Sequence, residues 1–201
     1  MRSGRRFRDL VAGLPRSRAA LEYAEQLHAG QLRDADGAPF IAHPIEVGLL
    51  LFDAGAPDDV IAAGVLHDSI EKSDTDTAQL RRRFGKRTAA LVAAVTEDDH
   101  ISGYATRKAA LRRQAEAAGT EAMMVFAADK VSKVRELPVD GPDSEAETES
   151  RTRQRRLAHY RRCLEMLEAH LADSPLVGQL RSELEARAAV PARRRALADA
   201  V

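Results

Sequence analysis

Helical periodicity runs through almost the whole of this chain and restricts the folds that it can adopt. Apolar residues recur three or four positions apart in nearly every segment, and almost no segment alternates as a half-buried strand would. The sequence contains no internal repeat and no change of composition that marks a second domain. A chain of 201 residues is long enough for one domain with a substantial core. The sequence therefore predicts an all-α, single-domain helical bundle.

Capping and turn residues divide the predicted bundle into helices. We expect Ser17 to cap the first core helix and Asp58 to cap the helix that contains residues 60–66. Asp76 or Thr77 is expected to cap a short helix that ends at Phe84-Gly85. These capping and turn residues predict a series of helices separated by turns and loops.

The predicted domain occupies residues 17–173 and is flanked by two segments. Residues 1–16 are basic, and we expect them to lie outside the domain and to be mobile. Residues 174–201 are expected to form a C-terminal helix and a basic tail. Within the domain, residues 138–150 are acidic, contain proline and lack apolar periodicity, which predicts a flexible surface loop.

Composition excludes several classes of function. Basic and acidic residues number 31 each, so no overall positive charge favours nucleic-acid binding. No apolar stretch reaches the roughly 18 residues that a membrane-spanning helix needs, and the arginine-rich start lacks the apolar run of a signal peptide. The single Cys163 excludes an internal disulfide and fits a reducing compartment. We expect a soluble, cytoplasmic protein, and the apolar positions of its C-terminal helices are compatible with a homodimer.

A His-Asp pair follows the most apolar helix of the chain. His67 and Asp68 come directly after residues 60–66, where burial should be deep. A buried carboxylate without a partner costs several kcal/mol, so such a group is normally paired through hydrogen bonds or bound to a metal ion. His43 at a helix start and Asp129 after an apolar helical run would complete a mixed nitrogen and oxygen ligand set, which suits manganese, iron or zinc.

Spacing alone leaves a second interpretation open. His67 and Asp68 can form a buried hydrogen-bonded couple, while Asp129 pairs with Lys130 or with Arg135. We assign no role to the other histidines. Arg107, Lys108 and the arginines of the long helix after residue 150 can add phosphate contacts, but charge runs on amphipathic helices are usually solvated faces. The histidines left without a role are His28, His100, His159 and His170.

Motifs along the chain resemble those of the HD-domain phosphohydrolases. More closely, they are similar to the hydrolase module of RelA/SpoT-type proteins and to stand-alone small alarmone hydrolases. The resemblance runs from about residue 17 to about residue 170 and lies in the order and spacing of the motifs. They are Gln31-x-Arg33, Asp36-Gly37-Ala38-Pro39-Phe40-Ile41-Ala42-His43-Pro44, Leu66-His67-Asp68-x-x-Glu71, Phe84-Gly85, Val95-Thr96 and residues 127–135.

The resemblance implies a metal-dependent hydrolase without a synthetase domain. It places one manganese ion on His43, His67, Asp68 and Asp129, and it implies removal of the 3′-pyrophosphate from guanosine tetra- or pentaphosphate. Arg33 is implied as a substrate contact, because a guanidinium can stack on a base or bind phosphate. Arg156 and Tyr160, one helical turn apart, match family positions near the pocket.

Two departures from the family pattern concern catalysis and specificity. Glu71 lies one turn after Asp68, where it can orient or deprotonate a water molecule. Lys72 stands where the family usually has a second acidic residue, and Lys133 stands where it commonly has asparagine. With Lys130, these residues make the expected pocket more positive, and Lys72 can bind phosphate as a point charge.

Three functions remain open at this point. The first is an alarmone pyrophosphohydrolase. The second is an HD-type nucleotidase or phosphodiesterase that acts on another phosphorylated nucleotide, which Lys72 and Lys133 favour. The third is a sensor that binds metal and nucleotide without turnover.

Overall fold

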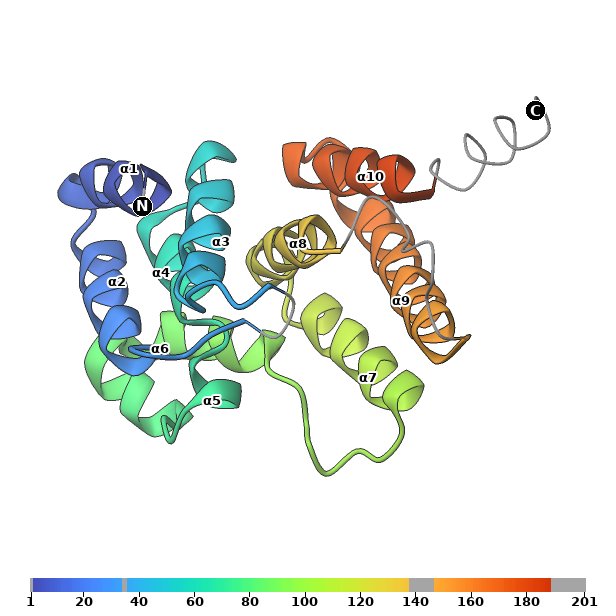
Figure 1. Cartoon of the computed structure of the whole chain (residues 1–201). Helices are drawn as coiled ribbons and strands as arrows, with labels where there is room; N and C mark the ends of the chain where they lie inside the picture. The colour runs from blue at the N-terminus through green and yellow to red at the C-terminus, as the bar shows by residue number, and fades with distance from the viewer. Residues whose placement is uncertain (1, 34–35, 138–146, 189–201) are drawn as a thin grey trace.

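The computed structural model describes residues 2–33, 36–137 and 147–188 (Figure 1). These residues form helices joined by turns, and the one β-type pairing among them is an isolated antiparallel bridge between Leu32 and Pro39. The predicted all-α fold is confirmed. None of the helices in the described ranges is long and apolar enough to cross a membrane.

The helices follow one another along the chain, and the longer connections among the described residues include those between α2 and α3 and between α6 and α7 (Figure 1). In chain order they are α1 (Arg2–Leu10), the 3-10 helix η1 (Val11–Gly13), α2 (Pro15–Leu27), α3 (Ala42–Asp53), α4 (Asp58–Leu66), α5 (Ser69–Lys72), α6 (Thr77–Val95), α7 (Tyr104–Ala117), α8 (Thr120–Arg135), α9 (Glu147–Leu171) and α10 (Pro175–Ala188).

The central element is α8, which contacts helices on every side. In Figure 1 it lies between a group formed by α1 to α4 and a group formed by α9 and α10. Eleven of its residues are buried, from Ala122 to Val134, because its apolar run faces α3, α4 and α6 on one side and the C-terminal helices on the other. This position explains why α8 is buried on several sides, including at the polar residues Asp129, Lys130 and Ser132.

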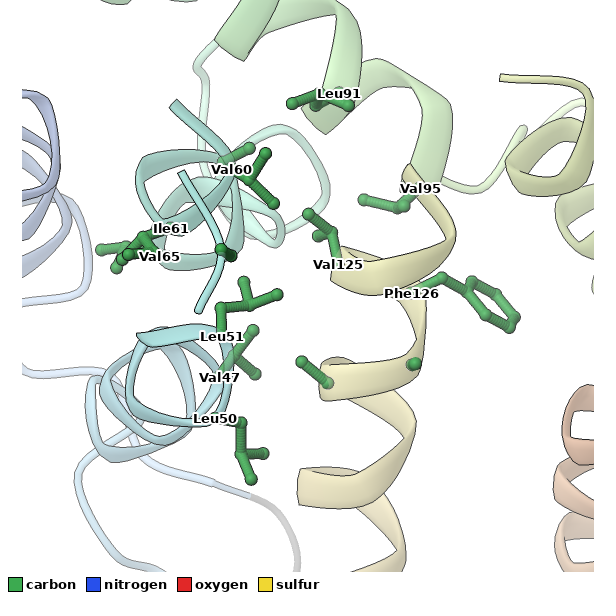
Figure 2. Packing of buried hydrophobic residues seen from close by; sticks show 14 of the residues in the cluster. Val47, Leu50, Leu51, Val60, Ile61, Val65, Leu91, Val95, Val125 and Phe126 are labelled. Carbon is green, nitrogen blue, oxygen red and sulfur yellow. The ribbon is translucent and has the colours of Figure 1, made fainter. Parts of the chain in front are cut away.

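Apolar side chains from several helices form the core beside the candidate site (Figure 2). Val47 and Leu51 of α3 meet Ile61 and Val65 of α4, and Val125 of α8 approaches them from the other side. All five are at most 1% exposed. Close packing here fixes the ends of α3 and α4, from which polar side chains project.

The N-terminal segment is helical and packs on the core. Phe7 of α1 and Val11 of η1 are fully buried, and α1 contacts α3. The expectation of a mobile segment was wrong for residues 2–13. Although the segment is basic, Phe7 and Val11 bury their apolar side chains in the core and hold it there. The domain boundary at residue 17 stays a prediction.

A contact between helices replaces the predicted cap at residue 17, and residue 58 does not cap its own helix. The helix α2 begins at Pro15, so Ser17 lies inside its first turn, and Asp58 is the first residue of α4 rather than its cap. The Asp58 carboxylate accepts hydrogen bonds from the backbone N–H groups of Arg16 and Ser17, at 3.0 and 2.8 Å. Asp58 therefore caps α2 from another helix, which sequence-local capping rules do not anticipate.

Two other boundaries were predicted with different success. Asp76 caps α6 by accepting a hydrogen bond from the Gln79 N–H at 2.6 Å, and the helix breaks at Gly85, whose φ is 88°. The predicted cap and the stop at Phe84-Gly85 are thus confirmed. The predicted loop 138–150 was too long, because α9 begins at residue 147. Residues 138–146 and 189–201 lie outside the described part of the chain.

We predict that Gly64→Ala destabilises the protein. A β-carbon at Gly64 would lie 2.2 Å from Leu51 Cδ1 and 3.2 Å from Val47 Cγ1, both in the packed core. We expect a loss of about 1–3 kcal/mol in the free energy of unfolding, measured in urea, although alanine favours helix. The control is Gly178→Ala in α10, where no atom lies within 4 Å and a gain of about 0.5–1 kcal/mol is expected. Equal stability of the two variants would contradict this account.

Candidate metal centre and pocket

Polar side chains from three helices converge on one buried point. His43 comes from the first turn of α3, His67 follows the last residue of α4, and Asp129 projects from α8. His43 Nε2 lies 3.1 Å from His67 Nε2 and 3.3 Å from Asp129 Oδ1. The distance from His67 Nε2 to Asp129 Oδ1 is 3.4 Å. One ligand atom from each residue therefore lies within 4.8 Å of the others, as a metal site requires.

Asp68 stands beside this cluster. Its Oδ2 lies 3.5 Å from His43 Nε2, and its Oδ1 lies 3.3 Å from His67 Nε2. Asp68 is 6% exposed and Asp129 is 7% exposed. All four residues that the family resemblance implied as ligands thus meet in space.

Hydrogen bonds on the far side of each imidazole assign its proton. His67 Nδ1 lies 2.8 Å from the Gly64 carbonyl, which can only accept, so Nδ1 carries the proton. His43 Nδ1 lies 2.8 Å from Ser132 Oγ, and that hydroxyl donates to the Glu46 carboxylate at 2.8 Å. Ser132 Oγ therefore accepts from His43 Nδ1–H. In the neutral form, both Nε2 atoms are left with bare lone pairs.

The resulting cluster has too many acceptors and too few protons. With both imidazoles neutral, two bare Nε2 atoms face each other, and the buried oxygens Asp68 Oδ2 and Asp129 Oδ1 have no hydrogen-bond partner among the described residues. Buried acceptors without donors are costly. A divalent cation would satisfy all four at once, and imidazole with carboxylate is a ligand set that such ions accept. The residues present therefore fit a metal ion.

Neighbouring cations keep both carboxyl groups ionised. Burial raises the pKa of Asp68, but His67 in its protonated form and Lys133 more than offset this effect and hold its pKa well below the usual range. For Asp129, burial is likewise outweighed, chiefly by Lys130, and the pKa is again well below the usual range. Deprotonated carboxylates are the form that binds metal.

Lys130 and Lys133 each pair with one of these aspartates. Lys130 Nζ donates to Asp129 Oδ2 at 2.5 Å and lies 4.4 Å from the centre of the Phe126 ring. Lys133 Nζ lies 3.5 Å from Asp68 Oδ2. Burial lowers the pKa of Lys130, yet Asp129 raises it further, so the ammonium group stays charged. The second interpretation of the spacing was therefore right about the Asp129–Lys130 pair, but the pair leaves Asp129 Oδ1 without a hydrogen bond.

A cavity of about 680 Å³ opens beside the cluster. The structure brings nearly all of the predicted site residues to its wall, and His43 lies behind it. The predicted residues that line it are Arg33, His67, Asp68, Glu71, Lys72, Asp129, Lys130, Lys133, Arg156 and Tyr160. Their roles stay predictions, but their proximity is consistent with one site.

Glu71 is held by the backbone of a distant segment. Its Oε1 accepts a hydrogen bond from the Glu97 N–H at 2.6 Å. Burial raises the pKa of Glu71, and the Glu97 N–H opposes this only in part. Such a carboxyl group is better suited to exchange protons near neutral pH than an ordinary glutamate.

The predicted substrate contacts differ in their surroundings. Arg33 is already engaged, because its guanidinium bonds to Asp36 at 3.0 Å and to Glu136 at 3.2 Å. None of the ion pairs among the described residues includes Lys72 or Arg156, although both line the cavity. These two cations are therefore better placed than Arg33 to bind an anionic ligand without giving up a partner.

Four of the residues that sequence reasoning missed in the cavity wall bear on its chemistry. They are Glu97, Tyr104, Lys108 and His159. Lys108 is not a solvated charge, since it forms an ion pair with Glu97. Burial and nearby cations lower the pKa of His159 to about 3, so this imidazole is neutral. Its spacing of three residues from Arg156 on α9 was the one signal in the sequence that could have placed it on the same face.

Comparison with known proteins shows where the chain belongs. It is 36% identical over 128 residues to a probable guanosine-3′,5′-bis(diphosphate) 3′-pyrophosphohydrolase of Synechocystis, covering 61% of this chain and 17% of the relative. It is also 36% identical over 121 residues to the human guanosine-3′,5′-bis(diphosphate) 3′-pyrophosphohydrolase MESH1, covering 59% of this chain and 67% of that protein. The chain thus spans less than a fifth of the long relative.

A solved structure shares the fold. It is described as a metazoan ortholog of SpoT that hydrolyses ppGpp, and it superposes with a TM-score of 0.73 at 24% identity, over 86% of this chain and 95% of that one. The sequence model of the HD domain matches residues 20–159, a range that contains His43, His67, Asp68 and Asp129. With most of its length inside that match, the chain belongs to the HD domain family.

Proposed function

We propose that this protein is a metal-dependent phosphohydrolase that removes the 3′-pyrophosphate from guanosine tetra- or pentaphosphate. The observation that carries the proposal is the group of buried acceptors beside a cavity lined with cations. Human MESH1 and the Synechocystis relative, both named for this activity, support the choice of substrate. The family match supports the metal requirement.

The metal would be held by four side chains of this protein. They are His43 and His67 through Nε2, and Asp68 and Asp129 through their carboxylates. We propose Mn²⁺, because a mixed set of imidazole and carboxylate suits a borderline-hard ion. When bound, such an ion polarises a phosphate oxygen and lowers the pKa of water.

Glu71 is proposed to move the proton. With Oε1 held by the Glu97 N–H, Oε2 is the oxygen that we assign to the attacking water. The water oxygen forms a bond to the phosphorus next to the 3′-oxygen, and Glu71 accepts the proton that the water loses. The bond between phosphorus and the 3′-oxygen breaks, the oxygen keeps the electron pair, and Glu71 returns a proton to it. The products are pyrophosphate and a nucleotide with a free 3′-hydroxyl group.

Lys72 and Arg156 are proposed to bind phosphate groups. Both line the cavity and form no ion pair with another described residue, so they can compensate the charge of a polyphosphate. Tyr160, Lys130 and Lys133 complete the proposed substrate contacts, and Arg33 would join them by exchanging its carboxylate partners. The cytoplasmic location and the homodimer stay predictions.

A second candidate is an HD-type hydrolase of another phosphorylated nucleotide. Lys72 favours it, because this cation lines the cavity where the family resemblance leads us to expect a carboxylate. A cation in place of an acid favours a substrate that presents more negative charge at this position. A sensor without turnover is the third candidate.

Release of pyrophosphate from guanosine tetraphosphate tests the proposal. We expect release by the Mn²⁺-loaded protein and its loss in Asp129→Ala, because that variant lacks a proposed metal ligand and an oxygen of the buried cluster. A panel of other nucleotides run in parallel separates the candidates. Turnover of another nucleotide alone would favour the second candidate, and tight binding without turnover of any would favour the sensor.

We predict that Glu71→Gln lowers kcat by about 10²–10⁴-fold, the usual contribution of a general acid or base. Because burial raises the pKa of Glu71, the proton-accepting form is lost as the pH falls through this raised value. The acid limb of kcat/KM should therefore lie above the pH at which an ordinary glutamate titrates. The matched control is Glu165→Gln on an exposed position of α9, which should leave kcat and the pH profile unchanged. An unaltered acid limb in Glu71→Gln would rule out this role.

We predict that Lys72→Asp raises kcat for guanosine tetraphosphate by about 10²-fold, the lower end of the range for an acid–base group. The variant restores the second carboxylate of the family pattern at the cavity wall. KM should rise as well, because one cation facing the phosphates is lost. Steady-state kinetics with native protein and variant measures both. A kcat that falls in the variant would show that Lys72 itself supports turnover.

A further inference from the structure

A hydrogen-bonded chain leads away from His43 on the side opposite the metal ligands. His43 Nδ1 lies 2.8 Å from Ser132 Oγ, and Ser132 Oγ lies 2.8 Å from Glu46 Oε2. Both His43 and Ser132 are fully buried. These hydrogen bonds join α3 to α8. Glu46 lies one turn after His43 in α3, and Ser132 lies one turn after Asp129 in α8.

Glu46 sets the direction of the protons in this chain. Its carboxylate can only accept, so Ser132 must donate to it and must accept from His43 Nδ1–H. Arg135 holds the carboxylate in place, with Nη1 at 2.9 Å from Glu46 Oε1. Arg135 is in turn bound to Glu183 of α10 at 2.7 Å. The direction of both hydrogen bonds therefore depends on one charged group.

We propose that Glu46 is a positioning residue: through the Ser132 hydroxyl it holds His43 in the Nδ1-protonated form and thereby sets the affinity of the buried cluster for a divalent cation. The ligand atom Nε2 is bare only in this tautomer. The proposal rests on the proposed metal site, but it does not depend on the substrate. Partners that orient a ligand histidine commonly contribute 10- to 100-fold, roughly, to metal affinity.

Glu136 offers a second acceptor, but with poorer geometry. Its Oε1 lies 3.5 Å from His43 Nδ1, beyond a good hydrogen bond, and it is engaged with Arg33 at 3.2 Å. Glu136 can add to the field that favours a proton on Nδ1. It cannot replace the short contact with Ser132, so removing Glu46 or Ser132 should still free the ring to change tautomer or to tilt.

Calorimetric titration of the full chain with Mn²⁺ alone tests the proposal. Glu46→Ala should weaken binding by about 10–100-fold, and Ser132→Ala should weaken it similarly. Glu46→Gln should weaken it less, because the amide keeps an oxygen that accepts from Ser132. The matched control is Glu183→Gln, which removes a carboxylate from the same Arg135 without touching Ser132 or His43. The Mn²⁺ affinity of Glu183→Gln should stay within about twofold of the native value, well below the roughly 10- to 100-fold loss expected when a partner that orients a ligand histidine is removed.

A second readout follows the tautomer itself in the protein without metal. Nitrogen-15 NMR of the histidine rings should find the proton of His43 on Nδ1 in the native chain and in Glu183→Gln. In Glu46→Ala we expect a mixture of tautomers, while His67 keeps its proton on Nδ1 because the Gly64 carbonyl remains. A general loss of packing would disturb both rings, so His67 serves as an internal control.

Two results would overturn the proposal. One is a folded Glu46→Ala protein, judged by its circular dichroism and melting temperature, whose Mn²⁺ affinity equals that of Glu183→Gln. The other is an unchanged His43 tautomer in both Glu46→Ala and Ser132→Ala. If guanosine tetraphosphate proves not to be a substrate while these metal affinities still differ, the proposed function fails and the role of Glu46 stands.

Discussion

A buried excess of hydrogen-bond acceptors is the constraint on which the rest of this structure depends. Two imidazole Nε2 atoms and two carboxylate oxygens meet where α3, α4 and α8 come together, with protons held on the far sides of the imidazoles. Such a cluster is unfavourable without a cation. The apolar packing of α3, α4 and α8, part of which Figure 2 shows, holds it together, and the stability of the fold thereby supports the chemistry of the site.

Charge around the cluster is arranged in layers. Lys130 and Lys133 lie against the aspartates and offset their charge, and the unpaired oxygen Asp129 Oδ1 remains available to a cation. Farther out, Lys72 and Arg156 line the cavity and, within the described ranges, take part in no ion pair. This order separates the groups that would hold metal from those that would bind phosphate. It also explains how a chain with no net charge can present a locally positive pocket.

Sequence patterns predicted the fold class and the residues of the cluster, because helical periodicity and the placement of charge after apolar runs are local signals. Contacts between distant segments were not predictable in this way. Asp58 caps α2 across 42 residues, Glu97 holds Glu71 through a backbone N–H, and Ser132 orients His43 from another helix. Phe7 and Val11 show the same limit, since two apolar residues in a basic segment revealed their burial only in three dimensions.

Anomalous diffraction from crystals soaked in Mn²⁺ would test the central claim most directly, since it locates the ion without reference to activity. The account predicts one strong peak per chain, bonded to Nε2 of His43 and of His67 and to carboxylate oxygens of Asp68 and Asp129. It also predicts no such peak in Asp129→Ala crystals treated in the same way. A peak elsewhere, or an empty cluster at saturating Mn²⁺, would contradict the claim that these buried acceptors exist to hold a metal ion.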